Sequence, residues 1–223
     1  MSKTKLLHFS VTAYKESVRE YQKDWKALDN VLYQLCKDHP RNDLPPSVYA
    51  KVFIIGRSYS SGIERLVSKT KEQPSGMTRV ADELIAHGQT VDRLFEHLRS
   101  IRLPMTTTAW EQIVSSHGQF VAMLKPLTAD GKSPRSFASK YLHFHFPIVP
   151  IYDSKAEWSL MHFEGGPEVV RLPTSENPNG ADGSYSWLVE RFGNLWEQVR
   201  SSGQTPTVKH IDHYLSDVAD RNW

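Results

Sequence analysis

The stretch that decides the fold is residues 12–36, TAYKESVREYQKDWKALDNVLYQLC. Its apolar side chains are spaced by alternating steps of three and four residues: Tyr14, Val18, Tyr21, Trp25, Leu28, Leu32 and Leu35. Such spacing puts them on one face of an α-helix, which turns about every 3.6 residues. We therefore predict one long amphipathic helix, with Cys36 at its end as a packed apolar side chain rather than a nucleophile.

The same spacing recurs along most of the chain. It predicts further helical segments, which run from Ser47 to about Leu66, Thr78 to Ile101, Thr108 to about Leu124, 134–146, from Asp153, across 188–199 and after Pro206. Prolines and capping residues separate these segments. No pair of alternating strands is convincing. The sequence thus predicts an all-α fold of about eight helices.

Local signals predict how several helices begin. Thr108 and Glu111 have the spacing of a capping box, Ser133 precedes a proline at a helix start, and Asp153 is a preferred N-cap residue. Residues 164–183 are rich in Gly, Pro, Asn and Asp, which predicts a long surface loop with a short strand at Val169-Val170.

The composition limits the classes of function. The chain has 223 residues, 39% of them hydrophobic, which is enough for a core in one domain spanning residues 1–223, in one or two lobes. No apolar run reaches the roughly 18 residues of a membrane span, and the start does not resemble a secretory signal. We expect a cytoplasmic monomer without a membrane partner, a cofactor or a metal. Because the net charge is only +2, a nucleic-acid site must be a local patch.

Residues 131–153, GKSPRSFASKYLHFHFPIVPIYD, form such a patch. No acidic residue lies between Asp130 and Asp153, while several side chains are cationic or can become so: Lys132, Arg135, Lys140, His143 and His145. Backbone N–H groups at a helix start bind phosphate through their donors and the helix dipole. We predict that Lys132, Ser133, Arg135, Ser136 and Lys140 contact DNA. The alternative is an ordinary helix with solvated lysines.

This segment continues in a pattern that resembles the helix-hairpin-helix DNA glycosylases. A helix is followed by a proline-containing link, Pro150-Ile-Tyr-Asp153-Ser, and by an Asp at the start of the next helix. Ala138, 15 residues before Asp153, matches the small residue of the second hairpin helix. The resemblance covers roughly residues 125–165. It implies a fold like that of these enzymes, with a DNA-gripping hairpin and Asp153 as the catalytic carboxylate.

Two departures narrow the activity that the resemblance implies. The family hairpin usually has a Gly-x-Gly turn, where this chain reads Gly131-Lys-Ser-Pro134. Bifunctional members carry a lysine nucleophile about 18 residues before the Asp, where this chain reads Pro134-Arg-Ser-Phe137, and Lys140 stands only 13 residues before it. The resemblance therefore implies a monofunctional glycosylase, in which a carboxylate stabilises the developing oxocarbenium ion and orients water.

Another candidate region is residues 56–65, GRSYSSGIER. On one continuous helix, Arg57, Ser61, Glu64 and Ser68 share a polar face. We predict that Arg57, Tyr59 and Glu64 contact the substrate, with Tyr59 stacking on an extruded base. Tyr152 and Trp158, which lie on either side of Asp153 in the sequence, complete the predicted pocket. The alternative is a surface network around Arg57, with Tyr59 and Trp158 in the core.

These observations favour a glycosylase that flips a damaged or modified base out of double-stranded DNA. A related hypothesis is bacterial anti-phage defence, with glucosylated cytosine as the excised base. One alternative is a non-enzymatic DNA-binding module in which Asp153 only caps a helix. Another is a metal-dependent nuclease, disfavoured because acidic residues are missing from the candidate segment.

Overall fold

The computed structural model describes residues 6–72, 75–164, 170, 172 and 182–223. Over these residues the chain is helical, and its β-type pairings are two isolated bridges, Leu7 with Phe163 and Val67 with Thr128. The prediction of an all-α fold is confirmed for this part of the chain.

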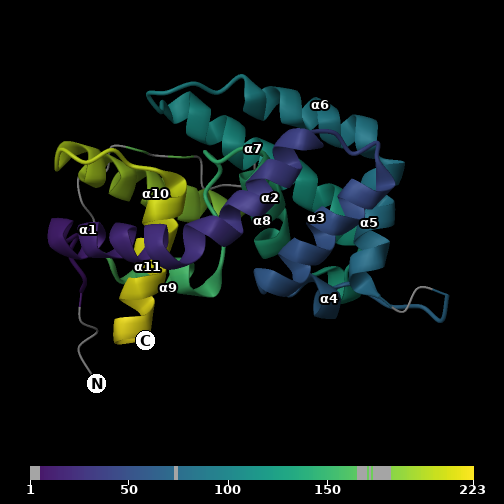
Figure 1. Cartoon of the computed structure of the whole chain (residues 1–223), viewed down its shortest axis with the longest axis horizontal. Coiled ribbons are helices and arrows are strands. Elements are labelled where there is room, and N and C mark those ends of the chain that lie inside the picture. The colour runs from purple at the N-terminus through teal and green to yellow at the C-terminus, as the bar shows by residue number, and fades with distance from the viewer. Residues whose placement is uncertain (1–5, 73–74, 165–169, 171, 173–181) are drawn as a thin grey trace.

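Most of the helices lie in two groups joined by three central helices, and α6 lies at the top of the view in Figure 1. Figure 1 shows α3, α4 and α5 on one side, α1, α9, α10 and α11 on the other, and α2, α7 and α8 between them. In chain order the bounds are α1 (Val11–Glu20), a π-helical turn (Tyr21–Trp25), α2 (Lys26–Asp38), α3 (Pro45–Ser58), α4 (Ile63–Leu66), α5 (Gly76–Ala86), α6 (Gly88–Arg99), α7 (Thr107–Leu124), two 3-10 turns (Lys125–Leu127 and Ala129–Gly131), α8 (Arg135–His145), α9 (Ser154–His162), α10 (Gly183–Ser201) and α11 (Val208–Asn222).

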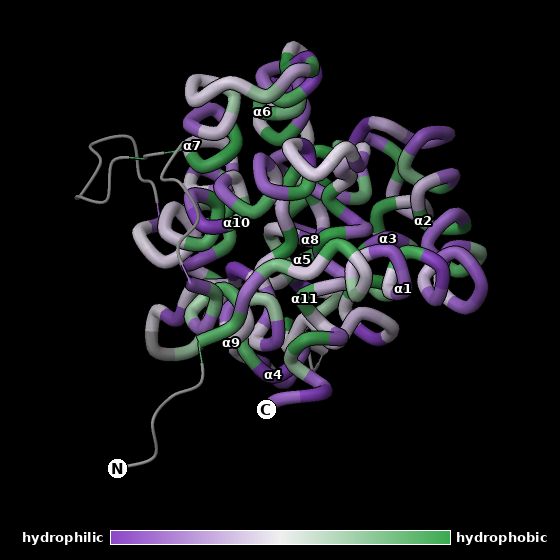
Figure 2. The backbone as a smooth tube through the Cα atoms, turned by 90° about the vertical axis from the view of Figure 1, so that its left-hand side faces the viewer, coloured by the Kyte–Doolittle hydropathy of each residue, from purple (hydrophilic) through white to green (hydrophobic). Residues whose placement is uncertain are grey.

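Helix α8 lies at the centre of the fold. It packs against α2, α3 and α7, and every residue from Phe137 to Phe144 is buried. A helix enclosed on all sides must also bury its polar side chains. Along the more peripheral helices, hydrophobic and hydrophilic stretches alternate, as expected where only one face meets the core (Figure 2). The polar residues of α8 therefore need partners inside the protein.

The long N-terminal helix is interrupted by the π-helical turn. The predicted stripe is wrong in its middle, because Trp25 and Leu28 are 55% and 47% exposed. Asp29 is buried instead, at 3% exposure, while Leu32 is buried as predicted, at 1%. A π turn holds more residues than an α turn and so rotates the helix that follows it. The rotation turns the carboxylate of Asp29 toward the interior.

Two predicted helices are each broken in two. The segment from Ser47 ends as α3 at Ser58 and resumes as α4, after a loop in which Ser60 and Gly62 have φ values of 48° and 72°. The shared helical face predicted for Arg57 and Glu64 therefore does not exist. Likewise, the segment from Thr78 divides at His87 into α5 and α6.

Capping was predicted correctly at one of three helices. Asp153 caps α9, whereas α7 is capped by Thr106 instead of Thr108. Ser133 is not a cap, because its hydroxyl donates to Asp182, the cap of α10. Val169 and most of the predicted 164–183 loop lie outside the described residues, and Val170 is not in a strand.

Candidate functional site

Asp153 stands where the link from α8 enters α9. Its Oδ1 accepts a hydrogen bond from the Ala156 N–H at 2.9 Å, and its backbone is extended, as is usual for an N-cap residue. The residue is half-buried, and no hydrogen bond to its Oδ2 is found among the described residues. One carboxylate oxygen thus stabilises the helix while the other can contact something else.

Lys140, on the central helix α8, points inward. The residue is only 6% exposed, and its Nζ donates to the backbone oxygen of Tyr59 at 2.8 Å and to the Ser136 hydroxyl at 3.2 Å. Burial lowers the pKa of its ammonium, while the charges of Asp153 and Asp212 act in the opposite direction. Its predicted role as a surface contact to DNA phosphates is wrong, since the fold encloses α8.

A second enclosed cation, Lys209, comes from α11, and its side chain is 17% exposed. Its Nζ lies 3.3 Å from Asp212 Oδ2 and 3.4 Å from Asp29 Oδ2. Burial disfavours this ammonium, but the two carboxylates outweigh burial and raise the pKa of Lys209. Asp29 also accepts the hydroxyl hydrogens of Tyr21 and Tyr59, at 3.0 and 2.7 Å. Asp29 is therefore surrounded by donors.

The Asp212 carboxylate pairs with Lys209 and is influenced electrostatically by Asp153. Its Oδ2 faces Lys209, while its Oδ1 is buried without a hydrogen-bond partner among the described residues. Burial raises the pKa of Asp212, Lys209 opposes that rise, and the negative charge of Asp153 adds to it. Asp29, Lys140, Asp153, Lys209 and Asp212 thus form one network, which we call the buried charge cluster.

Tyr59 ties the two cations of this cluster together. Its backbone oxygen accepts from Lys140, its hydroxyl donates to Asp29, and its ring lies 5.8 Å from Lys209 Nζ. The ring also packs on Phe144, with the centroids 4.7 Å apart. The next residue, Ser60, has a positive φ, which is uncommon for a side chain other than glycine. The α3–α4 loop is thus held against the cluster at Tyr59.

The other residues predicted from this segment lie apart from that contact. Arg57 is exposed. Glu64 is bound by Ser75, Lys69 and the backbone N–H of Met77. Burial acts to raise the pKa of Glu64, but these hydrogen bonds outweigh it and lower the pKa to about 2. Glu64 therefore stabilises the start of α5.

At the start of α8, the predicted phosphate contacts differ from one another. Lys132 is exposed, whereas Arg135 pairs with Asp182, which also accepts the Ser133 hydroxyl at 2.9 Å. Ser136 accepts from Lys140. The carboxylate absent from this segment in the sequence is thus supplied in space by Asp182. Lys132 alone of these side chains projects into solvent without a described ionic partner.

The two histidines of α8 do not add positive charge to this region. Burial lowers the pKa of His143 to about 3 and that of His145 well below its ordinary value. His143 Nδ1 lies 2.8 Å from the backbone oxygen of Val149, and its Nε2 contacts the Tyr33 hydroxyl. Both rings are therefore neutral near pH 7, which corrects the prediction of a patch that includes them.

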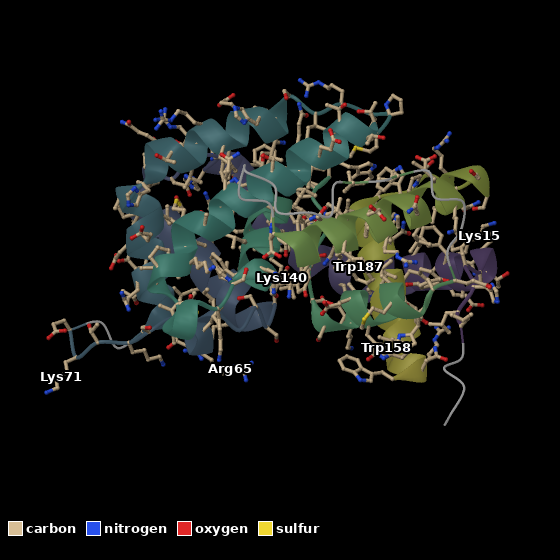
Figure 3. All side chains as sticks on the ribbon, turned by 180° about the vertical axis from the view of Figure 1, so that it is seen from behind. Lys15, Arg65, Lys71, Lys140, Trp158 and Trp187 are labelled. Carbon is tan, nitrogen blue, oxygen red and sulfur yellow. The ribbon has the colours of Figure 1, made fainter. Side chains whose placement is uncertain are left out.

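Tyr152 and Trp158 lie on the two sides of Asp153 in the sequence and take different partners. The Tyr152 hydroxyl donates to Glu157 at 2.7 Å, and its ring faces the Arg135 guanidinium at 5.9 Å. Trp158 stacks on His162, with the ring centroids 4.1 Å apart. In the view of Figure 3, Lys140 lies between Arg65 of α4 and Trp158 of α9.

Asp29, Lys209, Asp212 and Asp182 are the charged residues of this region that the sequence pattern did not single out. The burial of Asp29 could not be read from the spacing, because the π turn interrupts it. Lys209 and Asp212 are three residues apart on α11, a spacing equally typical of a solvated ion pair. Asp182 lies 47 residues beyond its partner Arg135.

Comparison with protein-family models, curated proteins and solved structures finds no match to this chain. Within the described residues, no group of three or more His, Cys, Asp or Glu side chains is arranged to hold a metal ion. No helix among them is long and apolar enough to cross a membrane. The single cysteine, Cys36, is buried in the core, and burial raises the pKa of its thiol to about 12.

Proposed function

We propose that the protein is a monofunctional DNA glycosylase that flips a modified base out of double-stranded DNA and hydrolyses its N-glycosidic bond. The observation that carries this proposal is the half-buried carboxylate of Asp153, which has one oxygen unpartnered among the described residues and acts electrostatically on a buried lysine. Charged groups in partly enclosed sites are more often catalytic than ordinary surface charges.

Hydrolysis of the N-glycosidic bond requires few protein groups besides this carboxylate. As the bond between base and sugar breaks, positive charge develops on C1′ of the sugar, and a nearby carboxylate stabilises it. The same carboxylate orients the water that attacks C1′. In this mechanism Asp153 provides the anion from its unpartnered Oδ2, while Oδ1 keeps its bond to Ala156 and holds the group in position.

The test is base release from duplex DNA followed by alkali, which breaks the strand at abasic sites. Asp153→Asn retains an N-cap residue, so its free energy of unfolding should stay within about 0.5 kcal/mol of the wild-type value. Its base release should fall below detection. Ser10→Ala is the matched control, because it removes the cap of α1, where Ser10 accepts from the Ala13 N–H. This control should lose about 1 kcal/mol of stability and keep its activity.

A second candidate function is a DNA-binding module without catalysis. The observation in its favour is the Asp153 bond to Ala156, which suffices to explain an aspartate at that position. The same assay separates the two proposals. DNA binding by the wild-type protein without alkali-sensitive breaks in any duplex would favour the module.

Backbone binding is expected to depend on Lys132. Because Arg135 is engaged by Asp182, Lys132→Ala should weaken DNA binding equally for all sequences and reduce the slope of log affinity against log salt by about 0.9. Fluorescence anisotropy at several salt concentrations measures this slope. An unchanged slope would remove Lys132 from the DNA interface.

For the excised base we propose a modified cytosine such as the glucosylated form in phage DNA, which would make antiviral defence the biological role. The support is the atypical sequence Gly131-Lys-Ser-Pro134 at the expected hairpin, which departs from housekeeping repair enzymes. Equal treatment of glucosylated and unmodified duplexes in the base-release assay would refute this assignment.

A further inference from the structure

Lys140 is a charged side chain that is almost fully buried. An ammonium loses its hydration when it is enclosed, and only strong partners recover the lost free energy. Lys140 is 6% exposed, yet its two hydrogen-bond partners, the Tyr59 carbonyl and the Ser136 hydroxyl, are neutral. The third N–H has no partner among the described residues. This is an unfavourable way to stabilise a fold and a suitable way to hold a proton donor.

Two other enclosed lysines differ from Lys140 in the charged groups around them. Lys209 is flanked by two carboxylates at 3.3 and 3.4 Å. Lys51 of α3 contacts the backbone oxygens of His39 and Arg41, where the chain leaves α2. The half-buried carboxylate that acts on Lys51 is Asp92, and its two oxygens are held by Asn42 and Arg41. Lys140 alone among these three combines neutral partners with the charge of a half-buried carboxylate, Asp153, one oxygen of which has no hydrogen-bond partner among the described residues.

The loop that contacts Lys140 is strained at the point of contact. Ser60 has a φ of 48°, and the carbonyl just before it, that of Tyr59, is the one that Lys140 contacts. Strained backbone of this kind persists where the surroundings hold it, and it gathers at functional sites. Tyr59 is itself fixed by its hydroxyl bond to Asp29. The position of Lys140 Nζ is thus set from two sides, by the α3–α4 loop and by Ser136.

We propose that Lys140 is the acid of the base-release step and that its third N–H supplies the proton that the departing base needs. This inference rests on the glycosylase activity proposed above and names a second catalytic residue beside Asp153. Lys140 is 6% exposed, and in the view of Figure 3 its label lies between those of Arg65 of α4 and Trp158 of α9.

The step is balanced in atoms and charge. The C1′–N bond breaks and its electron pair leaves with the base, which takes a proton from the Lys140 ammonium and departs neutral. Water forms the new C1′–O bond next to the Asp153 carboxylate. The proton that this water loses returns to the neutral Lys140 amine. The products are the free base and an abasic sugar with a hydroxyl at C1′, and both residues regain their starting charge.

The electrostatic surroundings suit this role. Burial lowers the pKa of Lys140 and the charge of Lys209 lowers it further, while Asp153 and Asp212 act to raise it. A general acid is most effective when its pKa lies near the working pH. The carboxylates from α9 and α11 thus oppose the lowering of the Lys140 pKa by burial.

The experiment uses the full chain and a duplex containing glucosylated 5-hydroxymethylcytosine, with an N7-methylguanine duplex beside it. Single-turnover base release is measured across pH for the wild type, Lys140→Met, Lys140→Arg and the control Lys51→Arg. Arginine keeps the positive charge but cannot release a proton near neutral pH. Both Lys140 variants should slow release of the glucosylated base by about 100-fold or more and lose the alkaline fall of the wild-type profile. Lys51→Arg should keep the profile.

Two further measurements distinguish a general acid at Lys140 from an ordinary lysine and from a nucleophile. In ¹³C NMR, the lysine Cε signal that disappears in Lys140→Met should titrate below the ordinary lysine pKa of about 10.4. Borohydride should trap no covalent adduct with DNA. An ordinary pKa, a trapped adduct at Lys140, or full activity in Lys140→Arg would each overturn the proposal.

Failure of this inference differs from failure of the proposed function. If the wild type releases a base, Asp153→Asn does not, and Lys140→Met releases it at the wild-type rate, the glycosylase stands and Lys140 is not its acid. If the wild type releases no base from either duplex or from DNA with other damaged bases, both are wrong. Since N7-methylguanine leaves without needing a proton, its release should be the less sensitive of the two to Lys140→Met.

Discussion

Lys140 of α8 and Lys209 of α11 belong to one buried charge cluster, but their surroundings have opposite effects. The carboxylates of Asp212 and Asp29 face Lys209 directly and raise its pKa despite burial. Neutral oxygens face Lys140, and burial lowers its pKa. Burial alone therefore does not decide the state of a lysine. The charge of its nearest partners does.

This difference indicates that the two lysines of the cluster have different roles. A lysine between two carboxylates holds helices together, since α11 supplies Lys209 and α2 supplies Asp29. A lysine between neutral acceptors contributes little stability and can give up its proton. Removing each lysine or one of its partners in turn tests this difference.

The largest expected effect is that of Lys209→Met on stability. It leaves Asp29 and Asp212 buried without their cation, which should cost about 3–5 kcal/mol of unfolding free energy. Lys140→Met removes an ammonium from neutral partners and should stay within about 1 kcal/mol of the wild type. Urea unfolding followed by circular dichroism measures both. Equal losses in the two variants would break the comparison.

Tyr59→Phe is expected to have the next largest effect. It removes the hydroxyl that donates to the buried Asp29 carboxylate at 2.7 Å, a charge-assisted bond that contributes about 1.5–3 kcal/mol. The backbone oxygen that accepts from Lys140 is unchanged. The variant should therefore unfold at lower urea but keep its pH profile of base release. The control, Tyr152→Phe, loses a hydrogen bond to the half-buried Glu157. Its free energy of unfolding should stay within about 1 kcal/mol of the wild-type value.

The helices of this fold could be predicted from sequence more completely than the cluster could. Apolar spacing marks most helices, and Asp153 was identified both as a cap and as a candidate carboxylate. The inward turn of Asp29 could not be predicted, because a π turn leaves no reliable sign in the spacing. Nor could the burial of Lys140, since a lysine on a helix is normally solvated and only tertiary packing around α8 encloses it.

The two lysines should also differ in how stability depends on alkaline pH. Lys209, whose pKa is raised in the folded state, stabilises the protein below the unfolded-state lysine pKa of about 10.4. This stabilisation is lost as the pH rises through the folded-state pKa of Lys209. A lowered pKa, as for Lys140, destabilises the protein at lower pH, and this penalty disappears as pH rises toward about 10.4. The wild type should thus gain stability relative to Lys140→Met on raising the pH and lose it relative to Lys209→Met. Urea midpoints of the three proteins at several alkaline pH values test the sign, and slopes of the same sign would contradict the assignment.

The smallest effect, and the sharpest probe of the α3–α4 loop, is that of Ser60→Gly. Glycine adopts a positive φ without strain but loses more freedom on folding, so the two contributions nearly cancel and stability should change by no more than about 1 kcal/mol. In Ser115→Gly, within α7, strain relief is absent and about 0.5 kcal/mol should be lost. Because the Tyr59 carbonyl just before Ser60 positions Lys140, a looser turn should slow base release several-fold while leaving DNA binding unchanged. Base release at the wild-type rate in Ser60→Gly would mean that Ser136 alone suffices to hold the ammonium in place, and the strain at Ser60 would then have no part in the chemistry.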